Sequence, residues 1–356
     1  MSNRAWLAPV AFLYGLAVAV RHKMFDWRIL RSREYDIPVV CVGNITVGGT
    51  GKTPVVEMLV RRLGDEYTIA VLSRGYKRKT KGYVEVERGM SFLKTGDEPK
   101  QIKQKFPGVV VAVCEKRAEG IDEIRRRHPE VDLIILDDGF QHRYVKPWVN
   151  IVLMDYMRPV YQDHMLPWGA LRDRLSQMHR ADYVLVTKCP PDMSALDRRL
   201  VRKWLKLYPY QGLYFCHTQA GHPVPMFPSA GYRGSLHLGA DVIAMSGIGN
   251  PEAFEKGLDA HYRVVDRLRY PDHHPYRSRD LADMERALAA SPESVIVATE
   301  KDAVKLMGSR KIPPAIAARL YYLPIRMTFY EDTEIDFIKN LKNDLRTNPK
   351  DRYAHP

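Results

Sequence analysis

Short apolar runs alternate with longer segments of helical spacing from about residue 39 to residue 207. Runs that are apolar throughout are typical of strands buried on both faces of a parallel sheet. The expected strands are residues 68–72, 109–113, 131–136, 150–154 and 183–187, and the clearest expected helices are 116–127 and 196–207. This alternation predicts an α/β fold with a mostly parallel sheet flanked by helices.

The composition changes near residues 218–234, where Pro223, Pro225 and Pro228 lie close together. A new α/β pattern then begins, with strands at 242–245 and 295–298 and a helix from Pro251 that Asn250 is expected to cap. We therefore expect four parts. They are a membrane-associating helical segment at 1–35, a core at 36–217, a smaller α/β domain at 218–342 and a disordered polar tail at 343–356.

Residues 5–20 carry no charge, and arginine and lysine follow them directly. A membrane-spanning helix needs about 20 apolar residues, so this one is short. Ala17-Val18-Ala19 imitates a signal-peptide cleavage site, but a basic cluster sits directly after it. A helix packed on the protein core is a further alternative. We favour a helix that lies in the cytoplasmic leaflet with its basic flank at the headgroups.

The formal net charge of +13 indicates an anionic partner such as a nucleotide, a phosphorylated substrate or an acidic membrane. No nucleic acid partner is expected, because no nucleic-acid-binding signature is present. The four cysteines, Cys41, Cys114, Cys189 and Cys216, are too dispersed for a disulfide framework and indicate a reducing compartment.

A glycine-rich loop follows the apolar run at 39–42, with four glycines at 43–51 and then Lys52 and Thr53. This is the layout of a phosphate-binding loop, in which backbone N–H groups converge on phosphate oxygens. We expect Lys52 to reach the β and γ phosphates, Thr53 to ligate Mg²⁺ and a helix to begin at about Pro54. The strict motif requires glycine where Thr46 stands. The rest of the expected ATP-binding set is Thr46, Gly48, Gly49, Thr50 and Gly51.

Polar residues follow several of the expected strands, at the sheet edge where ligands bind in such folds. Asp137 and Asp138 follow 131–136, as in a Walker-B motif that holds Mg²⁺. Arg74 and Tyr76 precede Lys77, Arg78, Lys79 and Lys81, which form either a solvated basic loop or a clamp for phosphate. Arg172 could neutralise a transferring phosphate or form only a surface ion pair with Asp173.

Two further segments are weaker candidates from the residues alone. Gly96-Asp97-Glu98-Pro99 is typical of a turn followed by a helix, and catalysis there is only one option. Asp272-His273-His274 could be metal ligands or a histidine assisted by a carboxylate in base chemistry, although adjacent histidines usually point apart.

Taken in order, these motifs resemble the tetraacyldisaccharide 4′-kinase family of Gram-negative bacteria. The segments that carry the resemblance are 42–54, 73–76, 96–99, 136–142, 169–172, 272–273 and 299–302. Members of this family lack the first Walker glycine, so Thr46 agrees with it. They usually carry Glu-Pro after Leu-Arg, whereas this chain has Asp173 and Arg174.

The resemblance implies a kinase that transfers the γ-phosphate of ATP to the 4′-hydroxyl of an acylated glucosamine disaccharide 1-phosphate in lipid A biosynthesis. It implies a P-loop NTPase-like core, Mg²⁺ held by Thr53, Asp137 and Asp138, and a peripheral or monotopic, monomeric protein at the cytoplasmic face of the inner membrane. It implies catalysis by Lys52 together with Asp97, the base paired with His273. The implied substrate-binding set is Asn44, Arg74, Tyr76, Gln141, His142 and Arg172.

A P-loop GTPase of the switch or metal-insertion type is the alternative. Thr187-Lys188 after an expected strand matches part of a guanine-reading motif, but Pro190 occupies the place of its aspartate. A non-enzymatic membrane adaptor is a third possibility, against which the expected Mg²⁺ site argues.

Overall fold

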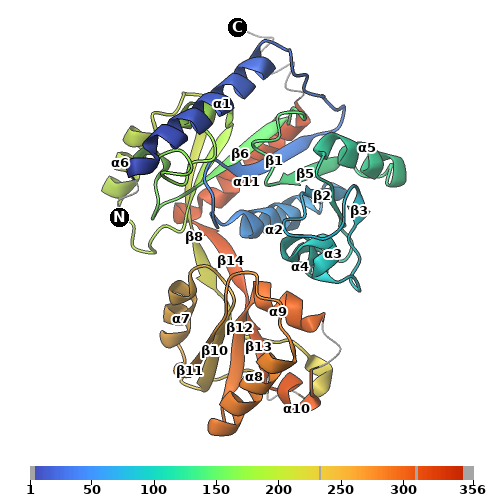
Figure 1. Cartoon of the computed structure of the whole chain (residues 1–356), viewed down its shortest axis with the longest axis vertical. Helices are drawn as coiled ribbons and strands as arrows, with labels where there is room; N and C mark the ends of the chain where they lie inside the picture. Colours follow the sequence, from blue (N-terminus) through green and yellow to red (C-terminus); the bar gives the residue numbers. More distant parts are fainter. Residues whose placement is uncertain (1–4, 232–233, 309–311, 348–356) are drawn as a thin grey trace.

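The computed structural model describes residues 5–231, 234–308 and 312–347, and within these it contains two β-sheets with helices packed against them (Figure 1). The helices are α1 (Ala8–Asp26), α2 (Lys52–Leu63), α3 (Phe92–Thr95), α4 (Asp97–Lys105), α5 (Arg117–Arg127), α6 (Ala195–Leu205), α7 (Pro251–Asp259), α8 (Ser278–Ala290), α9 (Glu300–Met307), α10 (Pro314–Ala317) and α11 (Thr333–Arg346). The strands of the larger sheet are β1 (Val39–Asn44), β2 (Ile69–Ser73), β3 (Val84–Glu85), β4 (Val110–Val113), β5 (Leu133–Asp137), β6 (Val149–Asp155), β7 (Tyr183–Thr187), β8 (Gly212–Ala220) and β14 (Ile325–Phe329). Those of the smaller sheet are β9 (Val224–Pro225), β10 (Asp241–Ser246), β11 (Arg263–Arg269), β12 (Val295–Thr299) and β13 (Leu320–Leu323).

The larger sheet has the order β14-β8-β7-β6-β1-β5-β2-β4-β3 and is parallel except for β14 and β3 at its edges. Neighbouring residues of β5 enter different hydrophobic cores, Ile134 on one face and Ile135 on the other. Burial on both faces explains why these strands are apolar at every position. Strand β1 lies between β5 and β6, so the residues that follow β1 and β5 meet at one edge of the sheet.

The smaller sheet has the order β11-β10-β12-β13-β9 and is parallel except for β9. It too has a core on each face, one around Met284 of α8 and one around Tyr321 of β13. Asn250 precedes α7 as expected, but its side chain makes no capping hydrogen bond. The turn before α7 is instead held by a hydrogen bond in which the N–H of Gly247 donates to the Asp302 carboxylate at 2.7 Å.

The last part of the chain returns to the larger sheet, which differs from the expected division into domains. Strand β14 pairs antiparallel with β8, and α11 packs against β6, β8 and β14. Residues 325–342, expected in the smaller domain, therefore lie with the core, and β8 crosses the expected boundary at 217/218. In Figure 1, β8 and β14 run between the two parts of the molecule. Residues 343–346, expected in the disordered tail, belong to α11, and residues 348–356 lie outside the described part.

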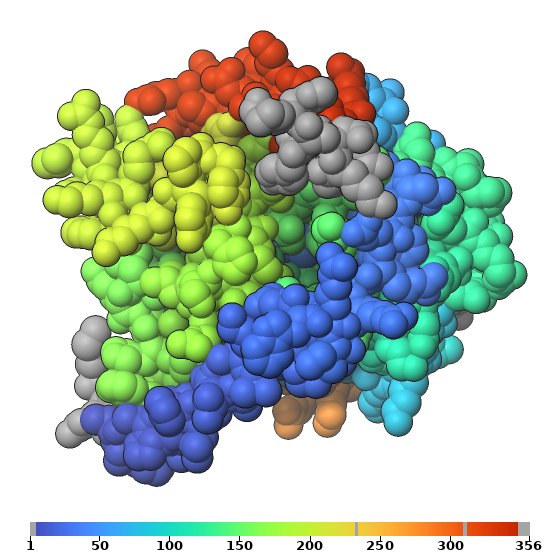
Figure 2. All heavy atoms as spheres, turned by 90° about the horizontal axis from the view of Figure 1, so that it is seen from above, coloured from blue at the N-terminus to red at the C-terminus, as the bar shows by residue number. Residues whose placement is uncertain are grey.

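The helical segment Ala5–Asp26, which is a short 3-10 turn followed by α1, is long and apolar enough to cross a membrane by length and composition, and only 11% of its most apolar stretch is buried. Trp6, Phe12 and Leu13 are exposed, while Ala11, near the start of the helix, is buried. Figure 2 shows this helix in dark blue along the surface of the protein. A helix packed into the core would bury its apolar side chains, so that alternative does not fit α1.

Candidate active site

The loop between β1 and α2 depends on glycine at three points. A Cβ on Gly43 would lie 2.6 Å from Cβ of Phe140, and Gly48 and Gly51 have φ values of +101° and +84°. Gly51 is the N-cap of α2, so the loop ends at the positive end of that helix. Thr46 is buried and forms a bridge with Leu171, so this position joins the loop to the segment that carries Arg172. The expected helix after the loop begins at Lys52, and Thr53 is its second residue.

Arg172 lies at the centre of the polar contacts around this loop. Its guanidinium donates to Asp138 Oδ2 at 3.1 Å and contacts the Asn44 side chain. Lys52 Nζ lies 3.6 Å from Asp138 Oδ1, and the Asn44 amide donates to Thr50 Oγ1 at 2.8 Å. Burial opposes ionisation of Asp138, but Arg172 and Lys52 lower its pKa to about 2. The structure thus brings these five predicted residues together, with Asp138 ionised at neutral pH.

Asp137 is a buried carboxyl group without a hydrogen-bond partner on either oxygen. Burial raises its pKa to about 7, assisted by the charges of Glu98 and Asp138. A bound cation would supply the missing partner and favour the ionised form, so the residues present fit Mg²⁺. Within the described residues, no group of three or more His, Cys, Asp and Glu is arranged to hold a metal. Mg²⁺ is commonly held by only one or two carboxylates together with substrate phosphates.

Asp97 and His273 come from different sheets and are in contact. Asp97 begins α4, and its Oδ2 lies 2.8 Å from Nδ1 of His273. Burial would raise the pKa of Asp97, but the hydrogen bond from His273 and the charge of Lys301 hold it well below its usual range. Asp97 is therefore a carboxylate at neutral pH. His274 points elsewhere and contacts Asp280 at 3.0 Å, so the two histidines do not act as a pair of metal ligands.

The remaining residues of the predicted substrate-binding set differ in their exposure and in their contacts. The Gln141 amide donates to Asn44 O at 2.7 Å, next to Arg172. Nε2 of His142 accepts from the N–H of Arg117 at the start of α5, and burial lowers its pKa to about 4. Arg74 is exposed. The Tyr76 ring lies 5.6 Å from that of His273.

The basic loop after β2 is not uniformly solvated. Arg78 is almost fully buried, pairs with Glu115 at 2.8 Å and donates to the carbonyl of Gly82 at 2.6 Å. Arg78 therefore holds the loop in place and is not free to bind phosphate. Lys77 and Lys79 are exposed and remain candidates for that role.

Asp173 has a structural setting and does not form the surface ion pair with Arg172 that the sequence left open. It is fully buried, contacts Nε2 of His22 at 2.7 Å and pairs with Arg180 at 3.5 Å. His22 belongs to α1, and Tyr14 of that helix donates to the carbonyl of Arg172 at 3.1 Å. Asp173 thus fastens α1 to the segment beside the loop.

Sequence reasoning missed Arg117 and gave no role to Lys301. The Arg117 guanidinium is buried and donates to the carbonyls of Asp137 and Asp138 at 3.4 and 3.3 Å. It follows the carboxyl end of β4, and that position was a signal that could have identified it. Lys301 follows β12 in the same manner and contacts both Asp97 and His273.

The model of the family described as tetraacyldisaccharide-1-P 4′-kinase (LpxK) matches residues 3–345. The chain belongs to this family. A tetraacyldisaccharide 4′-kinase of Phocaeicola vulgatus is 41% identical over 351 residues, which cover 97% of this chain and 96% of that protein. One from Porphyromonas gingivalis is 42% identical, covering 94% and 96%.

The fold of this chain is also similar to that of a solved member of the LpxK family. The crystal structure of an "apo" form of LpxK from Aquifex aeolicus in complex with ATP matches with a TM-score of 0.75 and 27% identity. The match covers 96% of this chain and 99% of that one. The expected P-loop NTPase-like α/β class is confirmed, and the match extends over both sheets.

Proposed function

We propose that the protein is an ATP-dependent tetraacyldisaccharide 4′-kinase, which transfers the γ-phosphate of ATP to the 4′-hydroxyl of tetraacyldisaccharide 1-phosphate in lipid A biosynthesis. The observation that carries this proposal is the family match over residues 3–345, which includes both the loop after β1 and the Asp97–His273 pair.

The nucleotide phosphates are held by the loop between β1 and α2. Backbone N–H groups around Gly48, Gly49 and Gly51 face the phosphates without side chains in the way, and the start of α2 adds its positive end. Lys52, which Asp138 contacts at 3.6 Å, binds the β and γ phosphates. Arg172 lies beside Asp138 and neutralises charge on the group in transfer.

Thr53, Asp137 and Asp138 are the residues that would hold Mg²⁺. Mg²⁺ bound there supplies positive charge to the β and γ phosphates. The unpartnered oxygens of Asp137 support this assignment, because a buried carboxylate needs a cation or donors to remain ionised. Asp138 has such donors already, in Arg172 and Lys52.

Asp97 is the base for the acceptor hydroxyl. The 4′-oxygen forms a bond to the γ-phosphorus, its proton passes to the Asp97 carboxylate, and the bond from phosphorus to the β–γ bridging oxygen breaks. That oxygen keeps the electron pair and leaves as part of ADP. A carboxylate of low pKa suffices, because in-line position and charge neutralisation matter more than base strength in phosphoryl transfer.

Acylated substrate lies in a membrane, and α1 is the part of the chain suited to contact it. Its exposed Phe12 and Leu13, and Trp6 in the short turn before it, can enter the interface. Arg21 near the end of α1 donates to the carbonyl of Gln141, which connects this helix with the site. We place the protein as a peripheral or monotopic monomer at the cytoplasmic face of the inner membrane.

Transfer of label distinguishes this function from a GTPase. The protein is incubated with γ-labelled ATP or GTP and the acylated disaccharide 1-phosphate. Label in the lipid from ATP supports the kinase, whereas phosphate release from GTP without labelled lipid supports the switch. The Thr187-Lys188 pair favours the kinase, because both side chains have other partners: Thr187 donates to Thr50 O and Lys188 pairs with Asp155, each at 2.8 Å.

A further inference from the structure

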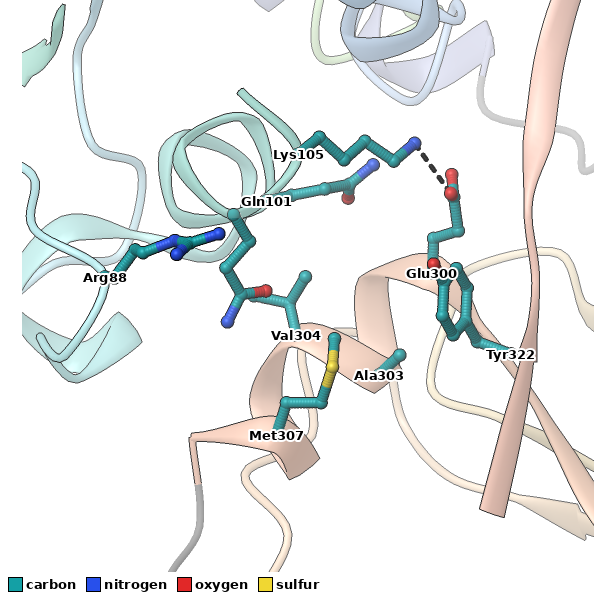
Figure 3. A pocket seen from close by; sticks show the side chains of 9 residues that line it. Arg88, Gln101, Lys105, Glu300, Ala303, Val304, Met307 and Tyr322 are labelled. Atoms are coloured by element: carbon teal, nitrogen blue, oxygen red, sulfur yellow. Dashed lines mark ion pairs between the residues drawn. The ribbon is translucent and has the colours of Figure 1, made fainter. Parts of the chain in front are cut away.

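Helices α4 and α9 form the main contact between the part of the chain around the larger sheet and the part around the smaller one. Lys105 at the end of α4 pairs with Glu300 at the start of α9 and with Glu57 of α2, each at 2.6 Å. Figure 3 shows Lys105 and Glu300 facing each other. They line a cavity of about 350 Å³ between the two helices. Both carboxylates are almost fully buried, so this contact fixes the first turn of α9 against α4.

Lys301 is the second residue of α9, and this packing points its side chain toward the first residue of α4, Asp97. Its Nζ lies 3.3 Å from Nε2 of His273, 3.6 Å from Oδ2 of Asp97 and 3.5 Å from Oδ1 of Asp272. Its side chain is only 21% exposed. Burial would lower the pKa of Lys301, but Asp97, Glu98 and Asp272 raise it, so the amine is protonated at neutral pH.

An ammonium group at this place determines which ring nitrogen of His273 carries the proton. A lysine ammonium has three donors and no acceptor, so a hydrogen bond between it and a neutral His273 requires Nε2 to accept. The proton of the neutral ring then lies on Nδ1, from which it is donated to Asp97 Oδ2 at 2.8 Å. Among the described residues, Oδ1 of Asp97 accepts only from the N–H of Glu98, at 3.2 Å, and keeps a lone pair.

We propose that Lys301 is a positioning residue for the transfer: its ammonium group holds His273 as the Nδ1–H tautomer and binds Asp97 Oδ2, which leaves Oδ1 oriented for the acceptor hydroxyl. The inference rests on the proposed kinase function. It gives α9 a role in the chemistry, because the packing of α9 against α4 places Lys301 beside both Asp97 and His273. Without Lys301, the carboxylate and the imidazole would both have other orientations open to them.

The test is steady-state kinetics of Lys301→Met, Lys301→Arg and the exposed control Lys256→Met. We expect kcat of Lys301→Met to fall by about 10- to 100-fold, since a small misplacement of a reacting group costs about that much. KM for ATP should stay within about twofold, because the loop after β1 is unchanged. Lys301→Arg should recover part of the loss, and Lys256→Met should match the wild type.

A double variant separates positioning from a general effect on the fold. If Lys301 acts by positioning Asp97, directly and through His273, then adding Lys301→Met to Asp97→Asn lowers kcat little further. If the two losses multiply, the positioning role is wrong. Should Lys301→Met fail to fold, Lys301→Cys is purified and treated with 2-bromoethylamine, which rebuilds an ammonium side chain. The native cysteines are all buried.

Recovery of kcat by aminoethylation, with none after treatment with iodoacetamide, supports the proposal. Wild-type kcat in Lys301→Met or in untreated Lys301→Cys overturns it. If instead the wild-type protein transfers no phosphate to the lipid, the proposed function has failed and not merely the role of Lys301.

Discussion

Replacing Asp97 by asparagine removes one charge from the site and little else. Asp97 is 6% exposed, and an asparagine oxygen can still accept from Nδ1 of His273, so the packing is preserved. What is lost is the carboxylate that receives the hydroxyl proton. General base catalysis contributes about 10²- to 10⁴-fold, equivalent to about 2.7–5.5 kcal/mol of barrier.

We therefore expect kcat of Asp97→Asn to fall by about 10²- to 10⁴-fold with little change in KM for ATP. The assay is initial-rate transfer of label from γ-labelled ATP to the lipid, with thermal unfolding as the check on folding. Asp65→Asn, at an exposed site in the turn after α2, serves as the matched control. A kcat within about threefold of wild type would contradict the base assignment, since the smallest contribution expected of a base is about 10²-fold.

The other predictions concern the loop, the metal and α1. Lys52→Ala should lower kcat/KM for ATP by orders of magnitude, measured by the same assay, and unchanged kinetics would exclude a phosphate contact. Gly43→Ala places a Cβ 2.6 Å from Cβ of Phe140, so the free energy of unfolding measured by denaturant titration should fall by about 1–3 kcal/mol. Asp173→Ala leaves the buried Arg180 guanidinium without its carboxylate and removes the partner of the His22 ring, which should lower the free energy of unfolding by about 3–5 kcal/mol in the same titration. The pKa of Asp137 is raised to about 7, so the carboxylate becomes protonated as the pH falls below that value. The affinity for Mg²⁺ should therefore weaken from pH 8 to pH 6 in a calorimetric titration. An affinity that does not change with pH would refute the role of Asp137 as a ligand.

Local patterns were sufficient for the parts of the fold made by neighbouring residues. The strand before the loop, the glycines and the helix from Lys52 follow from about fifteen consecutive residues. Asp137 and Asp138 were expected beside the loop because the carboxyl ends of parallel strands share one edge of a sheet, and Asp138 lies 3.6 Å from Lys52.

Pairings between distant residues could not be derived from such patterns. Strand β14 joins β8 across more than a hundred residues, and nothing in either strand specifies the other. The same holds for Asp97 and His273, 176 residues apart, which were joined only through the family resemblance. No helix was predicted at the position of α11, and its last residues were expected in a disordered tail, although Ile338, Leu341 and Leu345 have the spacing of one helical face.

The two connections between the larger and the smaller sheet leave side by side, where the N–H of Gly221 donates to the carbonyl of Pro324 at 2.8 Å. Residues 221–324 are thus a module that could be excised and its ends rejoined by a short turn. The shortened protein would keep the complete nucleotide loop and lose His273 and Lys301. Such a protein should bind ATP but not transfer its phosphate to the lipid. ATP binding and phosphate transfer would then be functions of one chain that a deletion can separate.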